Sequence, residues 1–268
     1  MIHTTRMGDP AGLPAVLAHC FLGHSGGWKR LLQALKTPLD AVAFDLPGHG
    51  RSAPWDRTRD LHSLATKGLA AQIGPAPALV IGHSFGGTLA LRQALEAPQT
   101  VRALVLIEPV LFAAVAGTRE FVDHVAAERP LRAAFQRGDL AEAARVFFAL
   151  NGDEAGWAAM PEPARTAMIR QMGMIDATHS VLMDDSAGLL RPGRMAAFGK
   201  PVLVLAGAMS PPIFPEAARN IAARLPQAAF ARVPGAGHMA PITHPAETAA
   251  LIDDWLAGEG MNERPRAG

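Results

Sequence analysis

A serine lies between two glycines in the stretch Ile81-Gly82-His83-Ser84-Phe85-Gly86-Gly87, directly after the apolar run 78–80. A serine hydroxyl is a weak nucleophile unless a base removes its proton and the backbone holds its oxygen exposed. Gly-x-Ser-x-Gly is typical of a strained turn between a strand and a helix, where small neighbours let the backbone approach closely. Residues 88–95 are typical of a helix, whose N-terminus would stabilise negative charge. The stretch predicts that Ser84 is a nucleophile.

Two further motifs accompany this serine. They are Asp45-Leu46-Pro47-Gly48-His49-Gly50-Arg51-Ser52 and Gly235-Ala236-Gly237-His238-Met239. Together with Gly-His-Ser-Phe-Gly-Gly they stand in the chain order of the α/β-hydrolase family, which the sequence resembles over nearly its whole length. The resemblance implies an α/β fold and a catalytic triad of serine, histidine and an acid. It is much less specific for substrate, because one scaffold hosts many reactions.

His238 is the base that the resemblance implies. It follows the last apolar run on a glycine-rich loop, and it comes after the serine in the chain, which is the order that the family uses. His49 and His83 fall in motifs where the family uses histidine structurally. Five other histidines are expected on loop or surface positions: His3, His62, His124, His179 and His244.

The oxyanion hole needs two backbone N–H donors. Phe85 supplies one by its position after the nucleophile. The stretch His19-Cys20-Phe21-Leu22-Gly23-His24 is similar to the family's His-Gly-x-x-Gly, which aligns Phe21 as the second donor. Cys20 stands where the family usually has glycine. We interpret it as a small buried packing residue rather than a nucleophile, because thiolate activation requires an electropositive setting.

The acid does not stand at the position where many family members carry it. That position follows the strand expected at 202–205, in a Gly-x-x-Asp pattern, and here the pattern ends in Ser210. A serine cannot carry the negative charge that stabilises an imidazolium. Some members carry the acid at the end of the preceding strand, which here is Glu108, and we predict that Glu108 completes the triad. The alternative is that Glu108 anchors the start of the next segment, and the weaker candidates for the acid are Asp184, Asp185 and Glu216.

Short apolar runs recur between helix-like segments, at 15–18, 41–44, 78–81, 103–107, 202–205 and 229–233. Runs without alternation, separated by helices, are typical of parallel strands that are buried on both faces. The predicted fold class is therefore α/β, with a doubly wound, mostly parallel sheet. Ligands bind at the carboxyl ends of such strands, so the candidate site residues are expected to share one rim.

More than ninety residues separate Glu108 from the strand expected at 202, which is far longer than a normal crossover. Helical spacing of apolar residues at 118–127, 140–150 and 161–174 predicts helices there. We interpret 113–195 as a helical cap inserted into a core of residues 1–112 and 196–268; the alternative is an ordinary run of core helices. The candidate substrate-binding residues on the rim and the cap are His19, His24, Phe112, Phe148 and Trp157.

Composition excludes several classes of protein. The chain is 49% hydrophobic and 18% charged with a formal net charge of +1, which does not favour nucleic acid as a partner. One cysteine forms no intrachain disulfide and favours the cytoplasm. No leader and no apolar run of roughly 18 residues is evident, so no membrane partner is expected. The oligomeric state is left open.

The residues favour a serine hydrolase that cleaves a small to medium ester, thioester or lactone through an acyl-enzyme, with a small-molecule acyl substrate. The mechanism implies no metal and no organic cofactor. Within the same fold, carbon–carbon bond hydrolysis and cofactor-free perhydrolysis also use serine and stay open. A catalytically silent ligand-binding protein is the alternative from another class.

Overall fold

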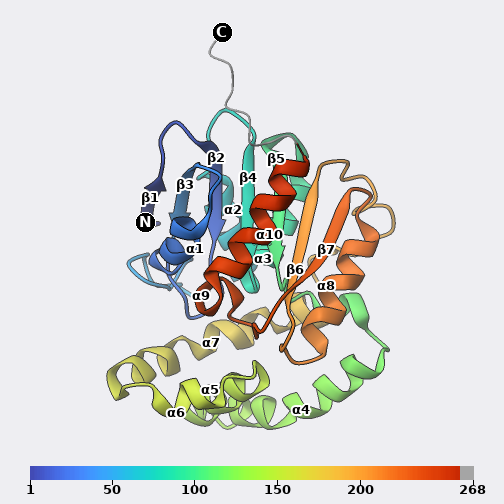
Figure 1. Ribbon diagram of the computed structural model, residues 1–268. Coiled ribbons are helices and arrows are strands. Elements are labelled where there is room, and N and C mark those ends of the chain that lie inside the picture. The colour runs from blue at the N-terminus through green and yellow to red at the C-terminus, as the bar shows by residue number, and fades with distance from the viewer. Residues whose placement is uncertain (260–268) are drawn as a thin grey trace.

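A seven-stranded sheet forms the centre of the computed structural model, which describes residues 1–259. The strands run in the spatial order β1-β3-β2-β4-β5-β6-β7, and all neighbours are parallel except β1 and β3 (Figure 1). The strands are β1 (Thr4–Gly8), β2 (Leu13–Ala18), β3 (Leu39–Phe44), β4 (Ala78–His83), β5 (Val101–Ile107), β6 (Val202–Gly207) and β7 (Ala228–Val233). The prediction of a doubly wound, mostly parallel sheet is confirmed.

Helices cover both faces of the sheet. One face packs against α1 (Lys29–Ala34), α9 (Ala240–Thr243) and α10 (Pro245–Gly258), and the other against α2 (Leu61–Ala70), α3 (Phe85–Glu96) and α8 (Ile213–Arg224). Strand β2 shows why its sequence has no polar alternation. Ala15 and Leu17 pack on the face that α1, α9 and α10 cover, whereas Val16 packs on the opposite face. Both faces of the strand must therefore be apolar.

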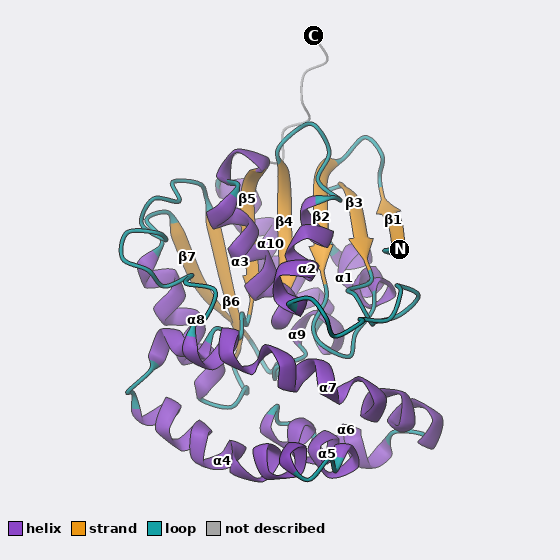
Figure 2. Ribbon diagram, turned by 180° about the vertical axis from the view of Figure 1, so that it is seen from behind, coloured by secondary structure: helices purple, strands orange, loops and turns teal. Residues whose placement is uncertain are grey.

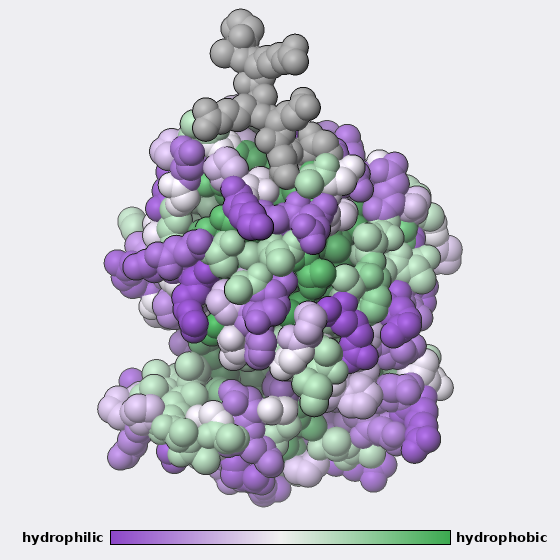
Figure 3. Space-filling model, in the orientation of Figure 1, coloured by the Kyte–Doolittle hydropathy of each residue, from purple (hydrophilic) through white to green (hydrophobic). Residues whose placement is uncertain are grey.

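The segment between β5 and β6 is helical and lies across the carboxyl ends of the strands (Figures 1 and 2). It contains the 3₁₀ turn η3 (Phe112–Val115) and the helices α4 (Arg119–Gln136), α5 (Leu140–Leu150), α6 (Glu154–Ala159) and α7 (Glu162–Asp184). We refer to residues 112–184 as the helical segment. Figure 3 shows polar and apolar side chains interspersed on one face of the molecule, with a constriction where this segment meets the body that contains the sheet.

Side-chain caps fix where three of these helices begin. Thr118, Asp139 and Asp153 accept hydrogen bonds from backbone N–H groups in the first turns of α4, α5 and α6. The helix predicted over 140–150 agrees with α5. The other two predicted helices are longer than expected, because α4 continues through Pro130 to residue 136 and α7 continues to residue 184.

The motif that begins at Asp45 shapes the loop after β3. The Asp45 carboxylate is buried and accepts hydrogen bonds from the backbone N–H groups of Ser25, at 2.6 Å, and Arg51, at 2.8 Å. Gly50 has a φ of 52°, and a Cβ atom there would collide with this carboxylate. The Asp45 side chain therefore holds the backbone of two loops at the carboxyl ends of the strands, which accounts for the motif.

Within residues 1–259, no helix combines the length and the apolar character that crossing a bilayer requires.

Candidate active site

Three loops at the carboxyl ends of strands bring Ser84, His238 and Glu108 together. Ser84 follows β4, Glu108 follows β5, and His238 lies in the loop after β7. The Ser84 Oγ lies 3.0 Å from His238 Nε2, and His238 Nδ1 lies 2.6 Å from Glu108 Oε2. All three side chains are buried. The structure thus places the three predicted triad residues in one hydrogen-bonded chain.

The turn at Ser84 is strained, as its motif predicts. Ser84 has a φ of 57° and a ψ of −119°, a backbone conformation that non-glycine residues rarely adopt. Its N–H donates to the carbonyl of Ile107 at 2.9 Å, which ties the turn to β5. A Cβ atom at Gly82 would collide with the carbonyl of Gly86, and one at Gly86 would collide with the carbonyl of Ala18. The two glycines therefore permit the close contacts that expose the serine oxygen.

Glu108 is held from two sides. Its backbone N–H donates to the carbonyl of Leu205 at 2.8 Å, and its Oε1 accepts from the N–H of Gly207 at 2.7 Å, leaving Oε2 for His238. Its φ of 45° is a second strained position on the rim. Burial alone would raise the pKa of Glu108, but the hydrogen bond and charge of His238, with Ser210 and Gly207, hold that pKa below its ordinary value. The group is therefore a carboxylate at neutral pH.

Ser210 lies beside this carboxylate instead of supplying one. Its side chain is buried, and its hydroxyl makes no hydrogen bond of good geometry within the described residues, although it contributes to the low pKa of Glu108. Among the weaker candidates, Asp185 ends α7 and accepts from the N–H groups of Leu189 and Leu190, so its carboxylate is used in a turn.

Two buried histidines hold the loops around the triad. His83 donates its Nε2–H to the carbonyl of His238 at 2.8 Å. His19 donates its Nδ1–H to the carbonyl of Cys20 at 2.7 Å and accepts at Nε2 from the N–H of Leu46 at 3.0 Å. Both nitrogens of His19 are hydrogen-bonded to the backbone. Its predicted contact with substrate is therefore limited to the carbon atoms of the ring. The sequence motif of His83 implied a structural role, and this bond shows what that side chain supports.

The two predicted oxyanion donors are Phe85, which follows Ser84 in the chain, and Phe21, which lines both cavities together with Ser84. Phe85 is the first residue of α3, where an N–H group has no acceptor inside the helix. Phe21 belongs to the loop of residues 19–24, and its N–H has no acceptor within the part of the chain that the structure describes. The two phenyl rings stack with centroids 3.9 Å apart, which couples the loop to the helix. This arrangement is compatible with two donors facing one oxyanion.

Cys20 is accommodated without backbone strain. The positive φ in this loop falls on Leu22, at 62°, and not on Cys20. Burial raises the pKa of the Cys20 thiol to about 12, so the group is uncharged at neutral pH. A packing role agrees with this environment, and a nucleophilic role does not.

Two cavities reach Ser84. The larger has a volume of about 330 Å³ and lies among His238, the loop of residues 19–24 and apolar side chains of the helical segment, including Phe148 and Met168. The smaller, of about 70 Å³, extends on the side of Phe112. Of the predicted substrate-binding residues, His19, His24 and Phe148 line the larger cavity and Phe112 lines the smaller. Trp157 lines neither cavity and packs on Phe148 with ring centroids 5.0 Å apart.

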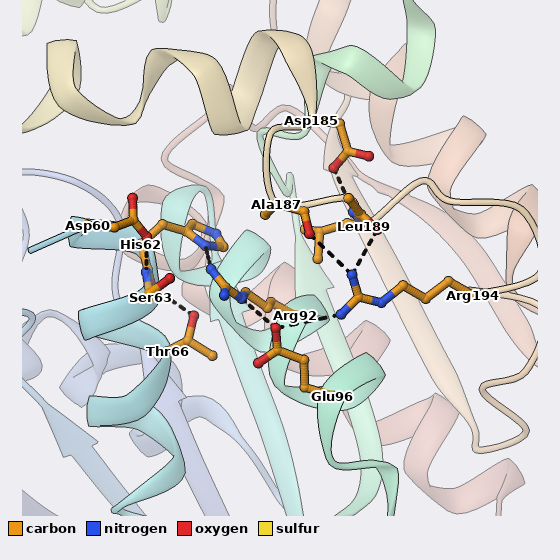
Figure 4. Close-up of polar contacts among 11 residues, drawn as sticks. Asp60, His62, Ser63, Thr66, Arg92, Glu96, Asp185, Ala187, Leu189 and Arg194 are labelled. Atoms are coloured by element: carbon orange, nitrogen blue, oxygen red, sulfur yellow. Dashed lines mark hydrogen bonds and ion pairs between the residues drawn. The ribbon is translucent and has the colours of Figure 1, made fainter.

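A polar network supports the nucleophile helix from behind (Figure 4). His62 is fully buried on α2, so its predicted surface position is wrong. Its Nδ1 accepts from Arg92 Nη1 at 2.8 Å, and its ring contacts the edge of Phe85 at 5.6 Å. Arg92 also pairs with Glu96 at 2.8 Å, and Arg194 bonds to the carbonyl of Gly188 at 2.8 Å while lying 3.6 Å from Glu96. The network connects α2, α3 and the chain that returns from α7.

Buried histidines predict that acid destabilises the protein. Burial lowers the pKa of His19, His62 and His83 to about 3 and that of His49 to about 4. In the unfolded chain these groups titrate near their ordinary value of 6.5, so between that pH and about 4 the unfolded state binds more protons than the folded state. The free energy of unfolding should therefore fall by about 5 kcal/mol between about pH 7.5 and 5.5.

Thermal unfolding followed by circular dichroism across this pH range measures the effect. The control is the range from about pH 7.5 to 9, where these four groups are neutral in both states and Tm should stay flat. An equal Tm at about pH 7.5 and 5.5 would show that the imidazoles are already accessible to protons in the folded protein.

Within residues 1–259, no cluster of three or more histidine, cysteine, aspartate or glutamate side chains has the arrangement needed to hold a metal ion.

Comparison with known proteins agrees with this fold. The family model described as the alpha/beta hydrolase family matches residues 15–251. The chain belongs to the α/β-hydrolase family.

Individual relatives match a smaller part of the chain than the family model does. Lipase LipV of Mycobacterium tuberculosis is 40% identical over 126 residues, which is 46% of this chain and 47% of the lipase. The pimeloyl-[acyl-carrier protein] methyl ester esterase of Nitrosomonas europaea is 36% identical over 106 residues, 40% of each chain. The matched stretches thus span about half or less of these relatives. Among solved structures, 2-hydroxy-6-oxo-6-phenylhexa-2,4-dienoate hydrolase from Rhodococcus superposes with a TM-score of 0.74 at 19% identity, over 96% of this chain and 94% of that one, which shows the fold.

Proposed function

We propose that the protein is a serine hydrolase that cleaves carboxylic esters, thioesters or lactones through an acyl-enzyme. The observation that carries this proposal is the hydrogen-bonded chain from Ser84 through His238 to Glu108 at the floor of an apolar cavity. The names of the lipase and esterase relatives support the same reaction class. A small-molecule acyl compound is the proposed substrate.

The proposed reaction begins with proton transfer. His238 Nε2 accepts the hydroxyl proton of Ser84 as the serine oxygen attacks the carbonyl carbon. The imidazolium that forms is stabilised by the Glu108 carboxylate at Nδ1, which also fixes the tautomer that leaves Nε2 free to accept. The negative oxygen of the tetrahedral intermediate is bound by the N–H groups of Phe85 and Phe21.

Release and hydrolysis use the same groups in reverse. His238 gives its proton to the leaving oxygen or sulfur, the bond to the carbonyl carbon breaks, and the acyl group stays on Ser84. Water, deprotonated by His238, then attacks the acyl-enzyme and the free acid leaves. His238 moves the proton in both halves of the reaction, and water supplies the oxygen of the acid that is released.

We also propose that residues 113–195 act as a cap on the core formed by residues 1–112 and 196–268. Side chains of the helical segment line both cavities, among them Phe147, Phe148 and Met160. Because these walls are apolar and close over Ser84, the segment would exclude water and select the substrate by shape.

The test is hydrolysis of p-nitrophenyl esters from acetate to decanoate by the intact protein, followed by release of p-nitrophenol. Saturable turnover is expected, with an optimum chain length that measures the space available to the acyl group. A fluorophosphonate probe should label Ser84 at the same time, and mass spectrometry of the peptide that contains it identifies the site. Absence of both turnover and labelling would contradict the proposal and favour a ligand-binding protein.

A further inference from the structure

The smaller cavity differs from the larger one in its lining. It has about a fifth of the larger volume, and its walls near the site include Phe112, Leu131, Ile175 and Phe214. Four polar side chains from the helical segment also line it: Asn151, whose amide donates to the carbonyl of Phe147, and the titratable His124, Glu128 and His179. The cavity is thus lined both by Ser84 and by titratable groups that the proposed mechanism does not use.

The three titratable side chains lie together. His124 and Glu128 are four residues apart on α4 and therefore share one face of that helix. His179 of α7 approaches from the other side, with its Nδ1 3.3 Å from Glu128 Oε1. The two histidines lie on helices and not on loops, and both are partly exposed while they line the cavity. We refer to these three residues as the polar trio.

His124 has hydrogen-bonding capacity to spare. Within the described residues its imidazole makes ring contact with Phe112, at a centroid distance of 4.8 Å, but no hydrogen bond. Burial lowers its pKa, while Glu128 opposes and His179 adds to that shift. A neutral imidazole offers one donor and one acceptor. An apolar ligand that displaced water from this donor and acceptor would leave both without a partner, which costs binding free energy.

The position of His238 indicates which part of an ester enters each cavity. His238 must reach the leaving-group oxygen to protonate it, and it lines the larger cavity and not the smaller one. Phe214 stands between, with its ring 4.2 Å from that of His238 and 5.4 Å from that of Phe112. The leaving group therefore belongs in the larger cavity, and the acyl chain in the smaller.

We propose that the smaller cavity binds a short acyl chain and recognises a hydroxyl group on it through the polar trio. A hydroxyl donates and accepts, so it matches a carboxylate next to an imidazole N–H. A carboxylate on the acyl chain would be repelled by Glu128. This inference rests on the proposed function, and it names the substrate class as esters of hydroxy acids with a larger apolar alcohol.

The experiment compares 2-naphthyl esters in matched pairs in which a methyl group replaces the hydroxyl. One pair is 3-hydroxybutanoate and 3-methylbutanoate, and the other is 6-hydroxyhexanoate and heptanoate, so that two lengths of reach are sampled. The intact protein is expected to show a kcat/KM about tenfold higher for the hydroxy ester in at least one pair, which is the size of effect expected from one hydrogen bond.

Two variants assign the preference to the polar trio. His124→Leu and Glu128→Gln should each reduce the ratio of the two kcat/KM values towards one. Asp123→Asn is the matched control, because it removes a carboxylate from the same helix at a side chain that is 70% exposed and outside the cavity. This control should keep the wild-type ratio. Two variants are used so that poor folding of one still leaves a result from the other.

The outcomes separate this inference from the function on which it rests. Turnover of both members of each pair that depends on Ser84 but shows no preference for the hydroxyl would overturn the inference alone. A hydroxyl preference that survives both His124→Leu and Glu128→Gln would do the same. No turnover of any ester that depends on Ser84 would overturn the proposed function and this inference together.

Discussion

Replacing Ser84 by alanine is expected to lower kcat for the best p-nitrophenyl ester by about 10⁵- to 10⁶-fold. The alanine keeps the backbone turn and the cavity but removes the oxygen that attacks the carbonyl and that lies 3.0 Å from His238 Nε2. Any remaining catalysis would come from the N–H donors and from binding. Steady-state rates of wild type and Ser84→Ala, measured on the same ester series, give the ratio.

Two controls belong to this comparison. The Tm of Ser84→Ala should match that of wild type, because the side chain loses one buried hydroxyl and keeps its Cβ atom. Fluorophosphonate labelling should disappear in the same variant. A variant that retains more than about a hundredth of the wild-type kcat would show that another residue is the nucleophile.

Replacing Glu108 by glutamine is expected to lower kcat by about 10⁴-fold, as the equivalent change in a serine protease does. Glutamine has nearly the same shape and can still accept from Gly207, but it is neutral. It therefore neither stabilises the imidazolium of His238 nor fixes the tautomer in which Nε2 accepts the serine proton. KM should change little, because Glu108 lines neither cavity.

Ser210→Ala is the matched control for the acid. Ser210 stands at the position where the resemblance to the family led us to look for the carboxylate, and it is buried beside Glu108. Its loss should change kcat less than tenfold, with Tm measured for both variants to separate chemistry from folding. A loss below tenfold in Glu108→Gln would place the acid elsewhere, whereas a larger loss in Ser210→Ala would show that the Ser210 hydroxyl helps to hold the Glu108 carboxylate.

Much of the sheet could be predicted because its central strands are buried on both faces. Strands β2 to β6 contain continuous apolar runs, and their order with helices between them defines the parallel sheet, whereas β7 at the edge is partly exposed and includes Arg232. Strand β1 was not predicted. It pairs antiparallel with β3 at the edge of the sheet, and its residues alternate between exposed and partly buried, so Thr4–Gly8 carry no apolar run.

The site was predictable where a residue sits in a local motif. The turn at Ser84 and the loop before His238 have glycine patterns whose steric reasons the structure displays. The prediction of Glu108 as the acid required both its position at the end of a strand and the resemblance to the family. His62 could not be placed, since its burial depends on Arg92 of another helix.

The polar trio could not be predicted from the sequence. The spacing of four residues between His124 and Glu128 was visible in the sequence, but His179 is 55 positions beyond His124 on another helix. Only the packing of α4 and α7 around the smaller cavity makes a site of them. The spacing of apolar residues in either helix does not predict how the two helices pack.

Cys20 can serve as a chemical probe of the loop that carries Phe21. The sequence holds one cysteine, and this residue is 5% exposed and lines the larger cavity. With a pKa of about 12, very little of the thiol is a thiolate at neutral pH, so alkylation of the folded protein is expected to be slow. A change in the labelling rate when a phosphonate is bound to Ser84 would therefore report a change in the surroundings of the loop of residues 19–24.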